Sequence, residues 1–325
     1  AVRLFTDGIA QLGSDGFSLD PELAFSLHFG LAECAFLTGE LERADQLLLD
    51  LLPRTSNELS IAEIYRVRVD LHITKGQMQR AAEIGLQGLR LFGVDLPAHP
   101  SREQVQREYE DVLVNLGSRT IESLIDLPFA TTPRIVAAMR ILSVFWAPAV
   151  FTDAQLTDLH LGRMVNLSLL HGNTDSAVMG YAWWGVTLIS TFHRFEEGYR
   201  FGKLALDLVE KYGFRSFRAK ALYTLELMSF WSEHIQQALK YVQGAFIAAV
   251  ESGDLPVACY CCNHAVTILL TQGTHLDVVF AESERRRAFA AAARFQDVVD
   301  IIVGSQRMME VMRGNTYHPN TFSGE

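Results

Sequence analysis

The chain has 325 residues, 49% of them hydrophobic, which is enough for two or three domains or for an array of repeats. Its net charge of −10 argues against a surface for nucleic acid or for an anionic membrane, because both need clustered lysine and arginine. The four cysteines make no disulfide framework, so we expect a reducing, cytoplasmic location.

Residues 1–93 are predicted to form paired helices. Asp20 and Pro21 are typical of a helix start, because aspartate accepts a backbone hydrogen bond as the N-cap and proline suits the first turn. This helix is expected to end at Gly39, and a second helix follows it. A further pair is broken at Gly76, so two helical hairpins are predicted here.

The hairpins repeat one spacing. Gly39 precedes Ala44 by five residues, and Gly76 precedes Ala81 by the same interval, with the two alanines 37 residues apart. A small residue at this place lets the second helix of a hairpin cross the first closely. A period of 37–40 residues with paired helices is typical of tetratricopeptide-like (TPR-like) repeats. Later equivalents, each 40 residues apart, are Gly198, Ala238 and Val278.

Residues 94–174 are less regular, and they are predicted to hold two divergent hairpins with long connections. Capping boxes, in which a serine or threonine and a glutamine three residues later satisfy backbone N–H groups, are predicted at Ser101 and Thr152. Pro148 is expected to close the helix that lies between them.

Residues 175–314 return to regular hairpins and are expected to end in a capping helix at about 294–313. The clearest hairpin, 181–214, has a turn at 193–195 and a glycine C-cap at Gly213. Residues 315–325 form a polar tail. The sequence therefore predicts an all-α fold, a TPR-like α-solenoid of about seven antiparallel hairpins.

The sequence contains no phosphate-binding loop, dinucleotide fingerprint, zinc-protease helix or serine-hydrolase elbow. Cys259, Cys261, Cys262 and His264 lie within six residues, but on one helix they do not converge as tetrahedral metal ligands. Small buried cysteines in a tightly packed helix are the favoured interpretation. We therefore expect no catalytic residue, no cofactor and no metal ion in this segment.

The first helices of stacked hairpins line the concave face of a solenoid, and several polar and aromatic side chains are expected to point into that groove. Such a groove can hold an extended peptide or a partner helix. The competing interpretation is that these aromatic side chains fill the core between helices. The candidates are Arg66, Asp70, Trp183, Lys220, Tyr223, Tyr260, Asn263 and His264.

Five stretches carry a resemblance that extends over about residues 20–314: LFGVDLPAHPSREQV (91–105), SRTIESLIDLPFATTPRIVAAMRIL (118–142), MVNLSLLHGNTDSAVMGYAWWGV (164–186), FGKLALDLVEKYG (201–213) and ESGDLPVACYCCNHAV (251–266). They resemble the helical repeat region of large bacterial signalling proteins. These proteins join a serine/threonine-kinase-like domain and a P-loop, STAND-like ATPase to that region, and GAF sensor and histidine kinase domains usually follow. The family's catalytic residues belong to the other domains, so the resemblance places none in this chain.

The resemblance implies a segment of a longer protein, and an opening pattern that starts in mid-helix is consistent with it. The leading hypothesis is a non-catalytic protein-interaction, scaffolding and regulatory module. Its partners would be proteins or peptides, namely the flanking kinase, ATPase or sensor domains, with neither nucleic acid nor membrane involved. The alternative is a sensor that binds a small ligand or peptide in the concave groove. An enzyme is the remote alternative.

Overall fold

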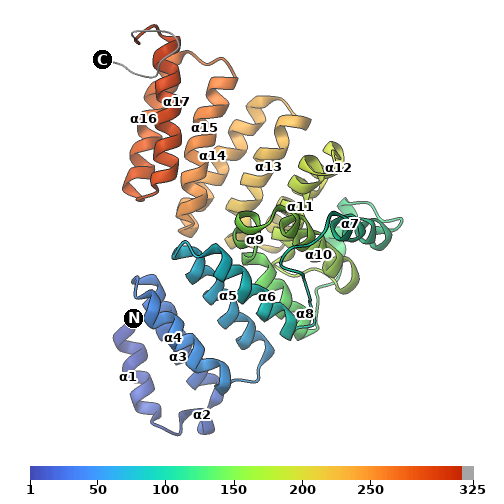
Figure 1. The fold of residues 1–325 in the computed structure, drawn as a ribbon, viewed down its shortest axis with the longest axis vertical. Helices are drawn as coiled ribbons and strands as arrows, with labels where there is room; N and C mark the ends of the chain where they lie inside the picture. Colours follow the sequence, from blue (N-terminus) through green and yellow to red (C-terminus); the bar gives the residue numbers. More distant parts are fainter. Residues whose placement is uncertain (317–325) are drawn as a thin grey trace. The chain divides into compact units, whose positions relative to one another are not determined.

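The protein is an all-α, TPR-like helical repeat, as predicted from the period of the sequence (Figure 1). A computed structural model describes residues 1–316, so residues 317–325 of the predicted polar tail lie outside the described residues. Within 1–316 the structure has no β-strand, and its one isolated bridge joins Phe129 to Asn173.

The packing of the helices groups the chain into two compact units. Unit 1 consists of residues 1–119 and 126–180, and unit 2 consists of residues 120–125 and the chain from residue 181 onward. Helix α11 (Ala177–Ser190) contributes residues to both. The three-part division at residues 94 and 175 stays a prediction.

Unit 1 begins with α1 (Val2–Leu12) and α2 (Gly16–Leu19), and the two hairpins predicted from the sequence, α3/α4 and α5/α6, follow them. The side chain of Asp20 accepts a hydrogen bond from the Leu23 N–H, and Pro21 occupies the first position of α3. Gly39 and Gly76 end the first helices with positive φ angles of 83° and 70°, which favour glycine. The helices of this unit are α1 (Val2–Leu12), α2 (Gly16–Leu19), α3 (Pro21–Leu37), α4 (Leu41–Leu51), η1 (Leu52–Arg54), α5 (Glu58–Thr74), α6 (Met78–Leu91), α7 (Arg102–Leu116), α8 (Pro133–Val144), α9 (Trp146–Thr152) and α10 (Ala154–His171).

The middle of the chain is not arranged as consecutive hairpins, because α7 packs on α10 and α8 packs on α5. Arg163 of α10 donates to both carboxylate oxygens of Glu108 on α7, at 2.9 and 2.7 Å. Glu108 is buried, and it also accepts a hydrogen bond from Asn166 at 2.8 Å. A buried, bidentate pair of this kind fixes which helix α7 meets.

Two helix ends in this region differ from the prediction, whereas the capping box at Ser101 is confirmed. Asp153, not Thr152, caps α10 by accepting hydrogen bonds from two backbone N–H groups. Pro148 lies in the first turn of α9, where a missing N–H has no cost, and the helix breaks earlier, at Phe145. Among residues 1–316 no single helix is long and apolar enough to cross a membrane. The bent pair α8 and α9, which meet at 53°, passes that length and composition test together.

Unit 2 consists of three consecutive hairpins, α11/α12, α13/α14 and α15/α16, followed by α17. As predicted, α17 caps the array by packing on α15 and α16. The helices are α12 (Phe195–Tyr212), η3 (Arg215–Phe217), α13 (Arg218–Ser232), α14 (Ile235–Ser252), α15 (Leu255–Thr271), α16 (Leu276–Ala292) and α17 (Gln296–Met312).

The short helix η2 (Glu122–Asp126) is tied to unit 2 by α12. Arg200 donates to both carboxylate oxygens of Glu122 at 2.7 Å, and this pairing lowers the pKa of Glu122 to about 2. The Tyr212 hydroxyl donates to the carbonyl oxygen of Ile125 at 3.0 Å. These bonds explain why residues 120–125 belong with α12.

Backbone contact between two glycines sets the geometry of the α11/α12 hairpin. A Cβ added to Gly198 would lie 2.5 Å from the carbonyl oxygen of Gly185, and a Cβ added to Gly185 would lie 2.5 Å from that of Gly198. No real Cβ comes so close to a backbone atom, so only glycine fits on either side. The predicted need for a small residue is confirmed here and at the fully buried alanines Ala44, Ala81 and Ala238.

The prediction that Val278 occupies the buried position at the helix crossing is wrong. Val278 is 57% exposed, whereas Val279 is fully buried. The second helix of the earlier hairpins begins two residues after the turn glycine, but α16 begins at Leu276, three residues after Gly273. One extra turn residue moves the buried position along by one.

We predict that Gly198→Ala destabilises the protein by about 1–3 kcal/mol, because the backbone oxygen of Gly185 cannot move aside as a flexible side chain would. Gly304→Ala, within α17, is the matched control, since its new Cβ would meet no atom within 4 Å. The control should be neutral or stabilising by up to about 1 kcal/mol. Urea unfolding followed by circular dichroism measures both, and equal effects would contradict a close crossing.

Candidate functional site

Four aromatic rings from alternate helices of unit 2 and the start of its last helix form a continuous row, which we call the aromatic ladder. It consists of Trp183 on α11, Tyr223 on α13, Tyr260 on α15 and Phe295, the residue before α17. The ring centroids are 6.4, 6.4 and 5.3 Å apart in that order. These are the distances of offset or edge-on aromatic pairs. Repeat stacking therefore places the predicted aromatic residues side by side.

A chain of hydrogen bonds runs beneath the ladder. His264 Nδ1 lies 2.9 Å from a carboxylate oxygen of the fully buried Glu226, and His264 Nε2 lies 3.2 Å from the Tyr223 hydroxyl. A carboxylate only accepts, so Nδ1–H donates to Glu226, and in the neutral ring Nε2 accepts from Tyr223. Burial, with the charge of Glu226, raises the pKa of Tyr223, which keeps its phenol protonated as a donor.

Two buried acceptors of this region have no hydrogen-bond partner among residues 1–316. They are the second carboxylate oxygen of Glu226 and the amide oxygen of Asn263. Leaving a buried polar atom unpaired costs about 1–3 kcal/mol, so such atoms are uncommon where stability alone matters. The adjacent Lys220 lies 3.5 Å from Asp254, and this ion pair is partly exposed.

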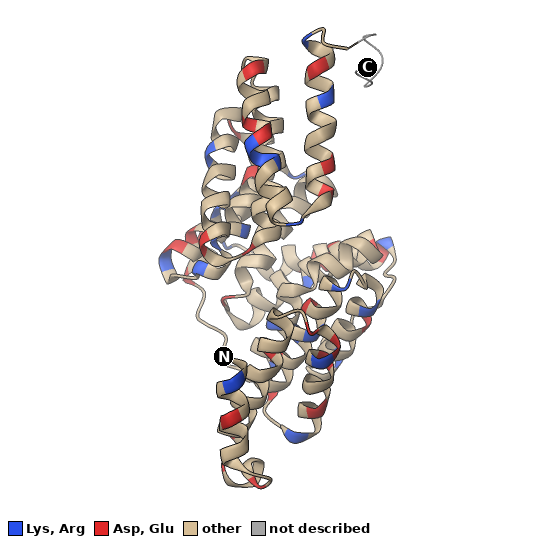
Figure 2. Ribbon diagram, turned by 90° about the vertical axis from the view of Figure 1, so that its left-hand side faces the viewer, with Lys and Arg blue, Asp and Glu red and all other residues tan. Residues whose placement is uncertain are grey.

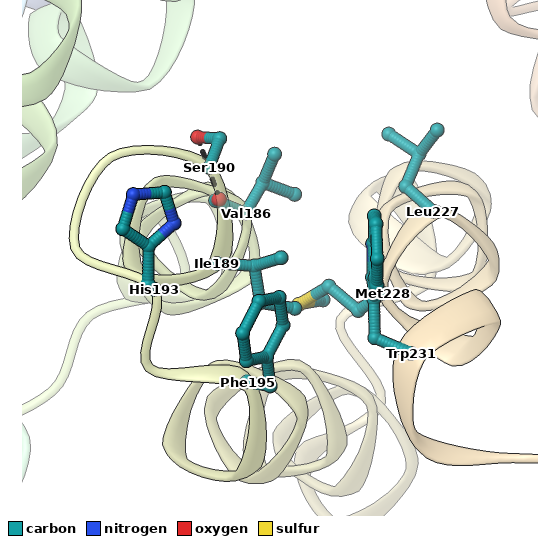
Figure 3. A pocket seen from close by; sticks show the side chains of 8 residues that line it. All are labelled: Val186, Ile189, Ser190, His193, Phe195, Leu227, Met228 and Trp231. Carbon is teal, nitrogen blue, oxygen red and sulfur yellow. Dashed lines mark hydrogen bonds between the residues drawn. The ribbon is translucent and has the colours of Figure 1, made fainter.

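A cavity of about 290 Å³ continues the same face of α11 and α13 (Figure 3). Val186 and Leu227 in its wall lie one helical turn beyond Trp183 and Tyr223. Ser190 contributes no free hydroxyl, because its Oγ donates to the Val186 carbonyl oxygen at 2.9 Å. The wall consists of Val186, Ile189, Ser190, His193, Phe195, Leu227, Met228 and Trp231.

Two aromatic rings at this cavity remain open to solvent. Phe195 is 39% exposed and Trp231 is 64% exposed, and their centroids are 5.3 Å apart. Figure 3 shows both rings beside Ile189 and Met228 in the space between α11, α12 and α13. We call the ladder and the cavity together the first-helix face of unit 2.

The two candidates in unit 1 have a different environment. Arg66 on α5 pairs with Asp70 at 3.2 Å and with Glu63 at 2.8 Å. Glu63 also accepts a hydrogen bond from Arg140 of α8 at 3.1 Å, and Glu33 of α3 lies 3.9 Å from Arg66. The two arginines and three carboxylates of this network pair across three helices, so Arg66 and Asp70 do not resemble the unit 2 site.

The structure brings Trp183, Tyr223, Tyr260 and His264 into one cluster, and Lys220 and Asn263 lie on the same two helices, α13 and α15. A binding role for these six residues stays a prediction. Trp183 is only 9% exposed, so it also fills part of the core.

Sequence reasoning missed Glu226 and the cavity residues Phe195 and Trp231. Glu226 lies four and seven residues after the buried Leu222 and Ala219 of α13, so the sequence places a charged residue on the apolar face of this helix. That placement could have identified Glu226 as a candidate. Phe195 and Trp231 come from different hairpins, and no single spacing in the sequence links them.

The cysteines of α15 belong to the core. Cys259, Cys261 and Cys262 are all fully buried, and burial raises the pKa of each thiol, that of Cys262 to about 11. They are therefore protonated near neutral pH, when a metal would need thiolates. Within the part of the chain that the structure describes, no three His, Cys, Asp or Glu side chains are placed to hold a metal ion.

Basic and acidic positions are interspersed along the helices drawn in Figure 2. The run of three arginines at 285–287 lies among acidic residues of the same helix, and Arg285 and Arg286 both donate to Glu282, Arg286 at 2.7 Å. This run is a paired helix face, as its spacing indicates.

The chain is similar in sequence to a known signalling protein. No family model matches the chain. The chain is 20% identical over 319 residues to hybrid signal transduction histidine kinase G of Dictyostelium discoideum. This similarity covers 92% of the chain but only 9% of that much longer kinase.

A structural comparison gives the crystal structure of the apo form of RapI, with a TM-score of 0.48 and 15% identity. It covers 89% of this chain and 97% of RapI. The bacterial kinase–ATPase context of the sequence resemblance stays a prediction.

We predict that Glu226→Gln leaves stability within about 1 kcal/mol of the wild type or raises it, because a buried amide loses less hydration than a buried carboxylate. His264→Ala should destabilise the wild type by about 3 kcal/mol, because it leaves that carboxylate uncompensated. The same His264 substitution should cost clearly less in the Glu226→Gln background.

Chemical denaturation of the four proteins in this double-mutant cycle gives the coupling energy between residues 226 and 264. Equal costs of His264→Ala in both backgrounds would show that His264 does not stabilise a buried charge on Glu226.

Proposed function

We propose that the chain is a non-catalytic protein-interaction and regulatory module of a multi-domain signalling protein, and that the first-helix face of unit 2 binds a peptide segment of its partner. The observation that carries this proposal is the continuity of the aromatic ladder, the buried acceptors and the apolar cavity on one face. A core that served stability alone would pair its acceptors and cover its aromatic rings.

The chemistry of this face suits an extended peptide or a helix. Tyrosine and tryptophan rings offer large contact area with few rotatable bonds, so little conformational entropy is lost on binding. The Tyr223–His264–Glu226 chain holds the central ring and its hydroxyl in one orientation. Rigid anchors of this kind dominate the binding energy of protein interfaces.

The similarity to a histidine kinase supports a place among signalling domains. We propose that the partners are kinase, ATPase or sensor domains of the same polypeptide. A partner that binds unit 2 in one of its conformations would shift the population toward that conformation, and attached domains would follow. This mechanism needs only differential binding and no chemistry in the repeat.

The position of the cavity favours a peptide over a free effector. Its volume of about 290 Å³ is close to that of small-molecule sites, but it lies beside the aromatic ladder, which suits an extended occupant. One side chain of a bound segment fits such a space, with the rest of the segment on the ladder. A small effector bound in place of a peptide is therefore the second outcome of the test below.

The test is a selection of random 12-residue peptides on the whole chain. We expect an enriched set of related peptides with Kd values of about 1–100 μM, and Tyr260→Ala should weaken their binding at least tenfold. Ile247→Ala on the second helix α14 is the control, because that side chain is 55% exposed and lies outside the ladder and cavity. Circular dichroism checks that both variants fold.

Failure to enrich any peptide, or equal losses for the two variants, would contradict peptide binding on this face. A thermal-shift screen of small metabolites runs in parallel. A metabolite that raises the melting temperature of the wild type but not of Tyr260→Ala, without any peptide binding, would establish the effector-sensor function instead.

A further inference from the structure

We infer that the cavity of unit 2 receives one bulky apolar side chain of the bound segment, a leucine, methionine or phenylalanine, and that a lysine or arginine next to it meets the cavity's acidic border. This inference rests on the proposed function, since it names the chemistry of the partner at the same face.

The apolar anchor follows from the wall of the cavity. Ile189 and Met228 are buried and form its inner part, while the exposed rings of Phe195 and Trp231 stand at its opening. An inserted apolar side chain would remove both rings from water, and the gain grows with the apolar area covered. A polar side chain would find few partners in the wall, such as the Ser190 Oγ lone pairs and the His193 ring, because the Ser190 O–H already donates to Val186.

The charge of the side chains around the cavity decides which residue type is favoured next to the apolar anchor of the bound segment. Arg194, Glu196, Glu197, Glu226 and Glu233 lie within two residues of a cavity residue, but Glu226 is fully buried and bonded to His264. The other four are one positive and three negative side chains. Arg194 is paired with Glu197. Among residues 1–316, Glu196 and Glu233 form no ion pair and carry a net charge of −2, with the Glu233 carboxylate accepting a hydrogen bond from the Tyr199 hydroxyl of α12. A cationic neighbour is therefore favoured over an anionic one.

The helix ends beside the cavity largely balance one another. Both α11 and α13 end there, at Ser190 and Ser232, and helix C-termini carry partial negative charge. The N-termini of α12 and α14 oppose this with partial positive charge, which Glu196 and Glu197 offset in α12 only. The side-chain charges therefore decide the match, and they favour an apolar–basic pair over an apolar–acidic pair.

Peptides from the selection on the whole chain provide the probe. The selected sequences are expected to share a Leu, Met or Phe next to a Lys or Arg. Trp231→Ala should weaken their binding at least tenfold, and Glu233→Lys should weaken it about threefold to tenfold in low salt and less in high salt. Phe230→Ala is the matched control, because this neighbouring ring on α13 is 40% exposed but lies outside the cavity wall.

The control should change the Kd by less than twofold, and Phe195→Ala serves as a second cavity variant if Trp231→Ala lowers the melting temperature. Peptides that lose affinity with Tyr260→Ala but not with Trp231→Ala or Phe195→Ala would overturn the anchor and leave the proposed function standing. Selected peptides with an acidic neighbour or no apolar anchor would also overturn it. If no peptide binds, the proposed function fails and the anchor fails with it.

Discussion

The close crossing of the two helices within each hairpin is the constraint on which the rest of the structure depends. In the α11/α12 hairpin it brings the backbones of Gly185 and Gly198 together, and elsewhere fully buried alanines such as Ala44 and Ala238 allow it. In unit 2, α13 and α15 are then each covered by their own second helix and by the second helix of the preceding hairpin. One face of each stays open, and that face carries the aromatic ladder and the cavity.

Much of this arrangement follows from local sequence signals, and the exceptions have physical causes. Helix periodicity, turn glycines and the repeat spacing predict the hairpins and also bring Tyr223 and His264 together, because residues one repeat apart lie on adjacent helices. The pairing of α7 with α10 was not predictable, since it depends on the tertiary contact between Glu108 and Arg163. The prediction of a buried small position at Val278 was wrong because one extra turn residue shifts the register of α16.

The two units use their first helices differently. In unit 1 the charges around Arg66 are paired with one another across neighbouring helices, which suits a structural role. In unit 2 the described residues offer no hydrogen-bond partner to one oxygen of Glu226 or to the Asn263 amide oxygen, and two aromatic rings beside the cavity stay exposed. Buried polar atoms without a hydrogen-bond partner among the described residues also occur in unit 1, at His72 and His160, so the exposed aromatic rings beside the cavity are what distinguish unit 2. We therefore propose unit 2 as the partner-binding unit.

Site-specific photo-crosslinking in cells of the source organism tests this assignment most directly. A photoreactive amino acid replaces Trp231 beside the cavity or, as the control, Ile247 on the second helix α14. We predict that position 231 forms a crosslink to one defined protein segment, identified by mass spectrometry, and that position 247 does not. Crosslinks of equal yield from both positions, or none from position 231, would contradict a binding face on the first helices of unit 2.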